Sequence, residues 1–145
     1  MKVYVGSDHA GFELKEKLKV YLKGFSGLTV EDKGAFEFNP TDDYPDFIKA
    51  TVEAVSADIN SKGIVLGGSG QGEAMVANKQ EGIRATEYYG GNLEIVKVSR
   101  EHNDANVLSL GARFINEDEA KQAVRIFLET PFSNEERHIR RIEEM

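Results

Sequence analysis

The chain has 145 residues, a net charge of −7 at pH 7 and no cysteine. This length is typical of one domain with one hydrophobic core, so a single domain is predicted over residues 1–145. The lack of cysteine excludes disulfides, zinc–thiolate sites, iron–sulfur clusters and a cysteine nucleophile. The acidic balance argues against nucleic acid or a membrane surface as a partner, and no apolar run is long enough to span a membrane. We expect no signal peptide and a cytoplasmic location.

Hydrophobic periodicity predicts strands that alternate with helices. In chain order, the patterns predict a strand at 2–7, a helix at 12–23, a strand at 28–32, a loop at 34–43, a helix around residues 48–55, a strand at 63–66, a helix at 73–80, a strand at 83–87, a helix at 93–100, a strand at 107–110, a helix around residues 120–128 and a charged helix at 133–144. This alternation is typical of an α/β fold with a parallel sheet. Ligands of such sheets bind beyond the carboxyl ends of the strands, so residues that follow strands are the candidates for chemistry.

A glycine cluster, Gly67-Gly68-Ser69-Gly70-Gln71-Gly72-Glu73, follows the third predicted strand. It lacks the Gly-Lys-Ser/Thr of a P-loop, and it lacks the third glycine of the dinucleotide-binding fingerprint. One interpretation is a tight turn between strand and helix. The other, which four glycines in six positions favour, is a loop whose backbone N–H groups bind an oxyanion.

Four acidic or histidine residues also lie just after or just before predicted strands. Glu73 is either a partner of the helix dipole or a general base beside the anion loop. Asp8 either caps the following helix or binds a polar substrate together with His9. His102 is either a surface histidine without a role or a group that exchanges a proton near neutral pH.

Basic residues gather near the carboxyl terminus of this acidic chain. Arg137 and Arg141 are four residues apart and would share one helix face, a spacing suited to one phosphate group. Arg113, after the fifth predicted strand, is a further cation. A solvated helix face is the alternative. The helix at 133–145 is more polar than a helix that only covers a core, so we expect it to pack on a neighbouring subunit.

Together these segments resemble the family of type B ribose-5-phosphate isomerases, which also contains galactose- and allose-6-phosphate isomerases. The resemblance covers nearly the whole chain in order. Its segments are Ser-Asp-His-Ala-Gly-Phe at 7–12, Asp-Tyr-Pro at 43–45, Gly-Gly-Ser-Gly-Gln-Gly-Glu at 67–73, Ala-Asn-Lys at 77–79, Gly-Ile-Arg-Ala at 82–85, Ser-Arg-Glu-His-Asn-Asp-Ala-Asn-Val at 99–107 and Arg-His-Ile-Arg-Arg at 137–141.

One position departs from the pattern of many members of that family. They carry a cysteine base just before the glycine loop, where this chain has Gly67. A second branch lacks the cysteine and uses a glutamate directly after the loop, which is the place of Glu73. The resemblance therefore implies that Glu73 is the base.

The resemblance implies a Rossmann-like three-layer α/β/α sandwich with a five-stranded parallel sheet. It also implies a homodimer, or a pair of dimers, whose sites are shared between subunits. The activity implied is the metal-free and cofactor-free interconversion of ribose 5-phosphate and ribulose 5-phosphate through a cis-enediolate, a step of the pentose phosphate pathway. The implied site comprises Glu73 as base, His102 as the acid that opens the sugar ring, Asp8, His9 and Asn103 on the substrate, Gly68, Ser69, Gly70, Gln71 and Gly72 around the enediolate, and Arg113, Arg137 and Arg141 on the phosphate.

Three rival functions stay open at this point. Isomerisation of a six-carbon sugar phosphate, galactose or allose 6-phosphate, differs only in the length of the pocket. A non-catalytic subunit that binds a sugar phosphate would need the arginines but neither Glu73 nor His102. A nucleotide-binding oxidoreductase is disfavoured because its fingerprint is missing.

Overall fold

The computed structural model describes all of residues 1–145 and contains five strands and six helices. In chain order they are β1 (Lys2–Ser7), α1 (His9–Leu22), β2 (Thr29–Asp32), α2 (Tyr44–Ala57), β3 (Lys62–Gly67), α3 (Gln71–Ala77), β4 (Ala85–Tyr88), α4 (Glu94–Asn103), β5 (Val107–Gly111), α5 (Glu117–Glu129) and α6 (Glu136–Glu143). Every predicted strand and helix is present, with ends that differ by a few residues.

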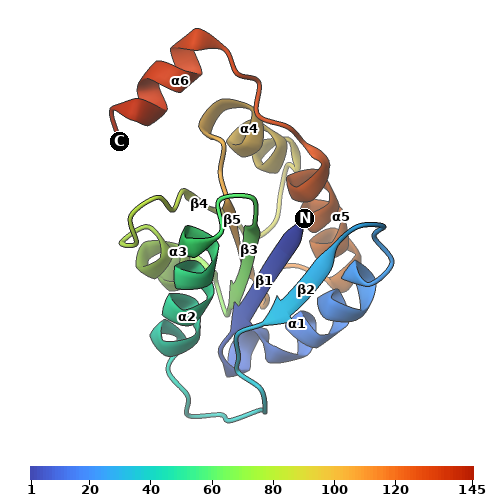
Figure 1. Cartoon of the computed structure of the whole chain (residues 1–145). Helices are drawn as coiled ribbons and strands as arrows, with labels where there is room; N and C mark the ends of the chain where they lie inside the picture. Colours follow the sequence, from blue (N-terminus) through green and yellow to red (C-terminus); the bar gives the residue numbers. More distant parts are fainter.

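The strands form one parallel sheet in the order β2-β1-β3-β5-β4 (Figure 1). Helices α1, α4 and α5 pack on one face through the larger apolar cluster, which includes Leu18, Val96 and Phe127. Helices α2 and α3 cover the other face through a smaller cluster around Val52 and Ala77. The prediction of a three-layer α/β/α sandwich with five parallel strands is confirmed.

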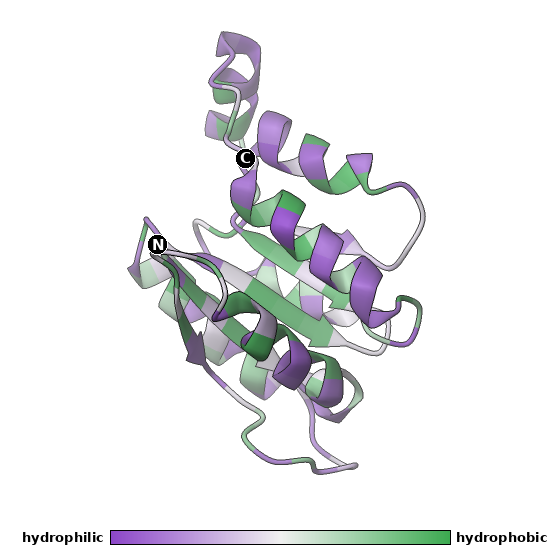
Figure 2. Ribbon diagram, turned by 90° about the vertical axis from the view of Figure 1, so that its right-hand side faces the viewer, coloured by the Kyte–Doolittle hydropathy of each residue, from purple (hydrophilic) through white to green (hydrophobic).

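Burial follows the sequence pattern closely. The inner strands β3 and β5 are buried along almost their whole length, and Figure 2 shows them as a hydrophobic centre between helices with hydrophilic outer faces. Helix α1 begins at His9, three residues before the predicted start, because the Asp8 carboxylate accepts hydrogen bonds from the Ala10 and Gly11 N–H groups at 3.0 and 3.2 Å. The cap therefore extends the helix to the end of β1.

Helix α6 stands apart from the sandwich. It projects beyond the end of the sheet opposite to the arrowheads of β1 and β2 and lies against α4 (Figure 1). Apart from His138 and the half-buried Ile142, its residues are exposed. No helix of the chain combines the length and apolar character that crossing a membrane requires.

Candidate active site

A cleft of about 590 Å³ opens at the carboxyl ends of β1, β3 and β5. Its walls come from the segments that directly follow these three strands, which include Asp8 and His9, the glycine loop, and Arg113. The switch point of the sheet lies here, because the connections from β1 and β3 run to opposite faces. The prediction that these post-strand segments meet at one edge is confirmed.

The glycine loop is held by contacts that leave no room for side chains. Gly70 has a φ of +84°, and the Ser109 hydroxyl donates a hydrogen bond of 2.6 Å to its carbonyl. A Cβ at Gly72 would lie 2.7 Å from the Tyr44 ring, so glycine permits the close approach of α2 to the loop. The loop is thus a rigid backbone surface facing the cleft.

Glu73 is buried at the first turn of α3 and lines the cleft, with 4% of its surface exposed. Burial raises the pKa of its carboxyl above the ordinary value, and the nearby carboxylates of Asp8 and Glu87 add to the rise. A carboxylate with a raised pKa in a cleft is a better base for a carbon acid than an exposed one.

Gly67 explains how Glu73 fits. A Cβ at residue 67 would overlap the Glu73 carboxyl group, so the glutamate occupies the volume that a side chain at this position would take. A cysteine at 67 and a glutamate in this conformation at 73 are therefore sterically exclusive. This clash gives a physical reason for the departure noted in the sequence.

His9 is oriented by a residue that the sequence analysis did not single out. Its ring Nδ1 lies 2.7 Å from Oδ1 of Asp42, which also accepts a hydrogen bond of 2.9 Å from the His9 backbone N–H. Since a carboxylate only accepts, Nδ1 carries the proton and Nε2 is the nitrogen left to act on a ligand. The Asp42 side chain is 7% exposed, and its Oδ2 is buried without a hydrogen-bond partner.

The same three residues form a potential metal cluster. Ligand atoms of Asp8, His9 and Asp42 lie within 4.8 Å of one another. Both carboxylates already have structural duties, one capping α1 and the other orienting the imidazole. These hydrogen bonds account for the cluster without an ion.

Arg113 brings the positive charge of the cleft. Its guanidinium packs over the backbone of Gly68, where a Cβ would lie 3.2 Å from Nη1. The side chain is exposed and makes no ion pair within the chain. It is therefore available to an anionic ligand that lies on the glycine loop.

The remaining predicted site residues lie at the other end of the molecule. Helix α4 begins after the carboxyl end of β4 and returns to the amino end of β5, so His102 and Asn103 lie at the edge opposite to the cleft. Arg137 and Arg141 project from α6, which contacts α4 there. Within one chain, these four residues do not line the cleft of Glu73.

His138 joins α6 to α4. Its ring lies 4.3 Å from the ring of His102, centroid to centroid, and its Nδ1 is 3.0 Å from the Ser133 hydroxyl. His138 is 2% exposed, so its surface is used in this packing. It holds the arginine-bearing helix beside His102.

Sequence reasoning missed several residues of the cleft. Tyr44 was part of a recognised motif but had no role, and Met75 and Phe114 line the opening with exposed apolar surface. Asp42 lies in a loop, 33 residues from His9, and no local pattern links the two. Only the proline at the start of α2, which positions Tyr44, gave a usable signal.

With this geometry in hand, the comparison with known proteins is direct. The sequence profile of the ribose/galactose isomerase family matches residues 3–145. The chain belongs to this family. It is 45% identical over 143 residues to ribose-5-phosphate isomerase B of Mycolicibacterium paratuberculosis, covering 99% of this chain and 88% of the relative. It is 37% identical to the Escherichia coli enzyme of the same name, covering 98% and 92% of the two chains.

Solved structures of family members have the same fold. Ribose-5-phosphate isomerase B of Mycoplasma genitalium, crystallised with bound ribulose-5-phosphate, superposes with a TM-score of 0.92 at 34% identity, over 99% of this chain and 92% of that one. The Thermotoga maritima protein gives a TM-score of 0.90 at 41% identity, over 99% and 95% of the two chains. The predicted membership of this isomerase family is confirmed.

Proposed function

We propose that this chain interconverts ribose 5-phosphate and ribulose 5-phosphate. The single observation that carries the proposal is the buried carboxyl of Glu73, which faces the same cleft as the glycine loop and Arg113. A base, a backbone anion site and a phosphate ligand are what an aldose–ketose isomerase needs in one place. Relatives at 42 to 45% identity over nearly the full chain carry the name of this activity.

Glu73 performs the proton transfer in this proposal. Its carboxylate removes the proton from C2 of the open-chain aldose, and the electron pair moves to form a cis-enediolate with the carbonyl oxygen at C1. The same carboxyl group returns the proton to C1. The proton of the O2 hydroxyl passes to O1, so that O2 becomes the ketone oxygen and O1 becomes a hydroxyl. A positioned acid–base group of this kind contributes roughly 10²–10⁴-fold in rate.

The glycine loop and the arginines supply the remaining steps. Backbone N–H groups of residues 68–72 face the developing charge on the enediolate oxygens, and each such donor is worth roughly 3–4 kcal/mol in the transition state. Asp8 binds the sugar beside the loop. His9 also binds the substrate there. Arg113, with Arg137 and Arg141, binds the phosphate, and this remote binding energy holds C2 against the base.

Opening of the sugar ring requires a second copy of the chain in this proposal. His102 protonates the ring oxygen and Asn103 lies beside it, yet both are at the edge of the sheet opposite to Glu73. Arg137 and Arg141 lie on α6, which packs against α4, the helix of His102. A homodimer in which α4 and α6 of one subunit reach the cleft of the other brings all these groups to one substrate.

The surface beside the cleft supports such a dimer. Exposed apolar side chains surround the opening, which suits a protein partner better than water. Met75 and Phe114 line the opening, Phe38 packs against the His9 ring, and Tyr89 packs against Phe114. A cytoplasmic location and any assembly beyond the dimer stay predictions from the sequence.

The decisive experiment is the conversion of ribose 5-phosphate in excess EDTA by the wild type, Glu73→Gln and the control Glu53→Gln, whose carboxylate is exposed on α2. We expect metal-independent turnover that falls by roughly 10²–10⁴-fold only in Glu73→Gln. Full activity of that variant would remove Glu73 from the mechanism. A wild type that acts on six-carbon phosphates instead, or on none, would replace the proposal by the six-carbon isomerase or by the non-catalytic binding subunit.

A further inference from the structure

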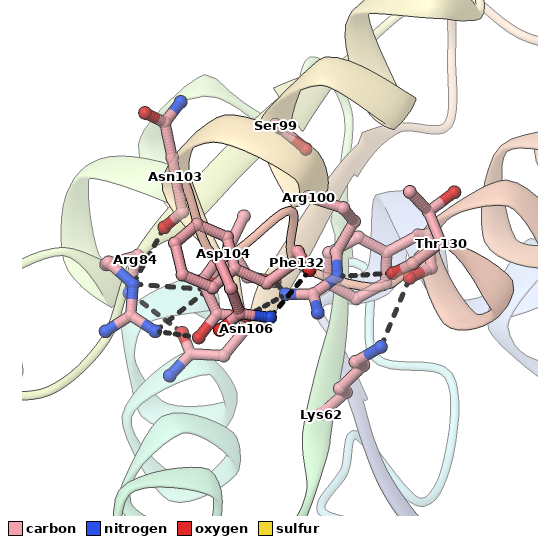
Figure 3. Close-up of polar contacts among 12 residues, drawn as sticks. Lys62, Arg84, Ser99, Arg100, Asn103, Asp104, Asn106, Thr130 and Phe132 are labelled. Carbon is pink, nitrogen blue, oxygen red and sulfur yellow. Dashed lines mark hydrogen bonds and ion pairs between the residues drawn. The ribbon is translucent and has the colours of Figure 1, made fainter. Parts of the chain in front are cut away.

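A second cavity lies at the amino ends of the strands, at the edge of the sheet opposite to the cleft. Its volume is about 410 Å³. Charged residues from three separate segments line it: Lys62 at the start of β3, Arg84 just before β4, and Arg100 and Asp104 at the end of α4 (Figure 3). None of these residues has a part in the proposed isomerisation.

The charges in this cavity do not balance. Asp104 is the one carboxylate of the lining, and both of its oxygens are taken: Oδ1 lies 2.7 Å from Arg100 Nη1, and Oδ2 lies 3.0 Å from Arg84 Nη2. Lys62 has no carboxylate partner. Its Nζ donates only to the carbonyls of Phe127 and Leu128, at 3.4 and 3.3 Å, and lies 5.5 Å from the centre of the Phe127 ring. Three cations therefore share one carboxylate in a chain whose net charge is −7.

Hydrogen-bond donors without a partner indicate which ligand would balance the excess positive charge. Arg84 Nη1 and Arg100 Nη2 make no hydrogen bond within the chain. The other guanidinium nitrogens of these two residues each donate at least one hydrogen bond. Lys62 Nζ has donors left beyond its two long contacts. Burial and, to a smaller extent, the charge of the neighbouring Arg100 lower the pKa of this amine to about 8, against a still smaller rise caused by Asp104. A bound anion would offset both the burial of the charged amine and its repulsion by Arg100.

We propose that this cavity binds the phosphate group of a small phosphorylated metabolite, with Lys62, Arg84 and Arg100 as its ligands. A phosphate group has enough acceptor oxygens to engage all three cations, and charge-assisted hydrogen bonds of this kind are the strong ones. The volume leaves room for the organic part of such a molecule. This site is distinct from the cleft at Arg113, which lies at the other edge of the sheet.

The same cations also hold the turn that carries His102. Arg84 donates to the carbonyls of Asn103 at 2.9 Å and of Asp104 at 2.8 and 3.1 Å, and Asp104 ends α4 with a positive φ of 45°. Arg84 and Arg100 thus keep the end of α4 in a conformation that few non-glycine residues adopt. Phosphate binding would change the position of these guanidinium groups and, through them, His102. This second part of the inference rests on the proposed function.

The binding test uses inorganic phosphate and the intact protein. Amide ¹H–¹⁵N resonances of residues 60–63, 82–84 and 104–106 report this cavity, and those of residues 68–73 report the cleft. We expect both sets to shift on titration, with separate affinities. Lys62→Met should weaken binding at the first set by roughly tenfold or more and leave the second unchanged, because one charge-assisted hydrogen bond is lost.

Lys49→Met, which removes an exposed amine on α2, is the matched control and should behave as the wild type. Melting temperatures of both variants confirm that they fold. No shift of the first set, or equal affinity in Lys62→Met and wild type, would overturn the binding site.

A pH series with inorganic sulfate isolates the amine, because the charge of sulfate is constant over this range. The charged groups that face Lys62 are Arg84, Arg100 and Asp104. The amine itself, with a pKa of about 8, changes its charge within this series. Since an anion favours the protonated amine, affinity should fall as the pH rises through about 8 in the wild type and stay constant in Lys62→Met. A fall of the same size in the variant would contradict the assignment to Lys62.

Activity separates the coupling from the binding. Phosphate in the cleft competes with substrate and raises KM, whereas phosphate in the distal cavity acts on kcat. We expect a change of kcat at saturating substrate that disappears in Lys62→Met. Binding without this change would retain the site and overturn the coupling, and neither outcome bears on whether the chain is an isomerase.

Discussion

The two edges of the sheet are built in opposite ways. At the carboxyl edge, Glu73, the glycine loop and Arg113 converge in one cleft, and each is held by contacts inside the chain. At the amino edge, His102 lies on α4 and the arginines Arg137 and Arg141 lie on α6, which packs against α4. In the proposed mechanism, one edge is therefore a preorganised half-site, and the other carries the groups that this half-site lacks.

This difference indicates which steps of the proposed reaction need a second subunit. A proton transfer at carbon requires a desolvated base and a rigid anion site, and one chain provides both. In the proposed mechanism, ring opening and complete binding of the phosphate also need His102, Arg137 and Arg141. The same chain does not bring His102 to its own cleft, because α4 ends at the opposite edge of the sheet. The following experiments test this division.

The largest expected effect is the recovery of activity by mixing two impaired variants. Glu73→Gln and His102→Asn, each with strongly reduced turnover alone, are co-expressed so that mixed dimers form. If each site uses Glu73 of one subunit and His102 of the other, random mixing restores about a quarter of wild-type activity. Conversion of ribose 5-phosphate measures it. A mixture no more active than its parts would place both residues in one chain's site.

Gly67→Ala tests the steric account of the base. Its Cβ would displace the Glu73 carboxyl, and a misplacement of about 1 Å costs up to roughly 10²-fold in kcat. Gly24→Ala is the matched control, because Gly24 has no positive φ and meets no closer atom than 3.3 Å. Undiminished kcat in Gly67→Ala would show that the carboxyl moves freely and that the cleft is less rigid than its contacts indicate.

Asp42 tests whether the substrate-binding His9 is also preorganised. Asp42→Ala frees the His9 ring, so KM should rise by roughly fivefold, the value of a net hydrogen bond of ~1 kcal/mol, with kcat nearly unchanged. Asp42→Asn keeps an acceptor for Nδ1–H and should lose less. The ¹⁵N shifts of the imidazole should report the Nδ1–H tautomer in the wild type and in Asp42→Asn, and a mixture of tautomers in Asp42→Ala. A mixed tautomer in the wild type would contradict the role of Asp42.

The smallest effect is a shift in the pH profile. Because burial, with Asp8 and Glu87, raises the pKa of Glu73, kcat/KM should fall on acidification with a midpoint above the ordinary glutamate value of 4.5. Glu87→Gln should move this midpoint down, toward 4.5, because one of the charges that raise it is removed. A midpoint that does not respond to Glu87→Gln would mean that the charge at residue 87 is screened from the cleft.

The same pKa has a consequence for stability. A carboxyl whose pKa is higher in the folded state destabilises the fold when it is ionised, and this cost is relieved as the pH falls through the raised pKa. Glu73→Gln should therefore melt at a higher temperature than the wild type at neutral pH, and the difference should vanish at acidic pH. An equal melting temperature at neutral pH would deny the desolvation of Glu73.

Much of this molecule is readable from its sequence because the signals are local. Short apolar runs predicted the strands, because strands of a parallel sheet are buried on both faces, and the helical spacing of apolar residues predicted the helices, which bury one face. The four glycines before Glu73 revealed a backbone surface, because only a residue without a side chain tolerates the φ of Gly70 and the approach of Tyr44 to Gly72. Parallel topology then places all post-strand segments at one edge.

Contacts between distant segments were decided by the tertiary structure alone. The pairing of His9 with Asp42, the overlap of Glu73 with the volume beside Gly67, and the excess of cations around Lys62 depend on how loops and helices pack, and no sequence period encodes them. The same holds for the separation of His102 from Glu73. The sequence shows that both residues are present, but the direction in which α4 crosses the sheet places them at opposite edges of the sheet.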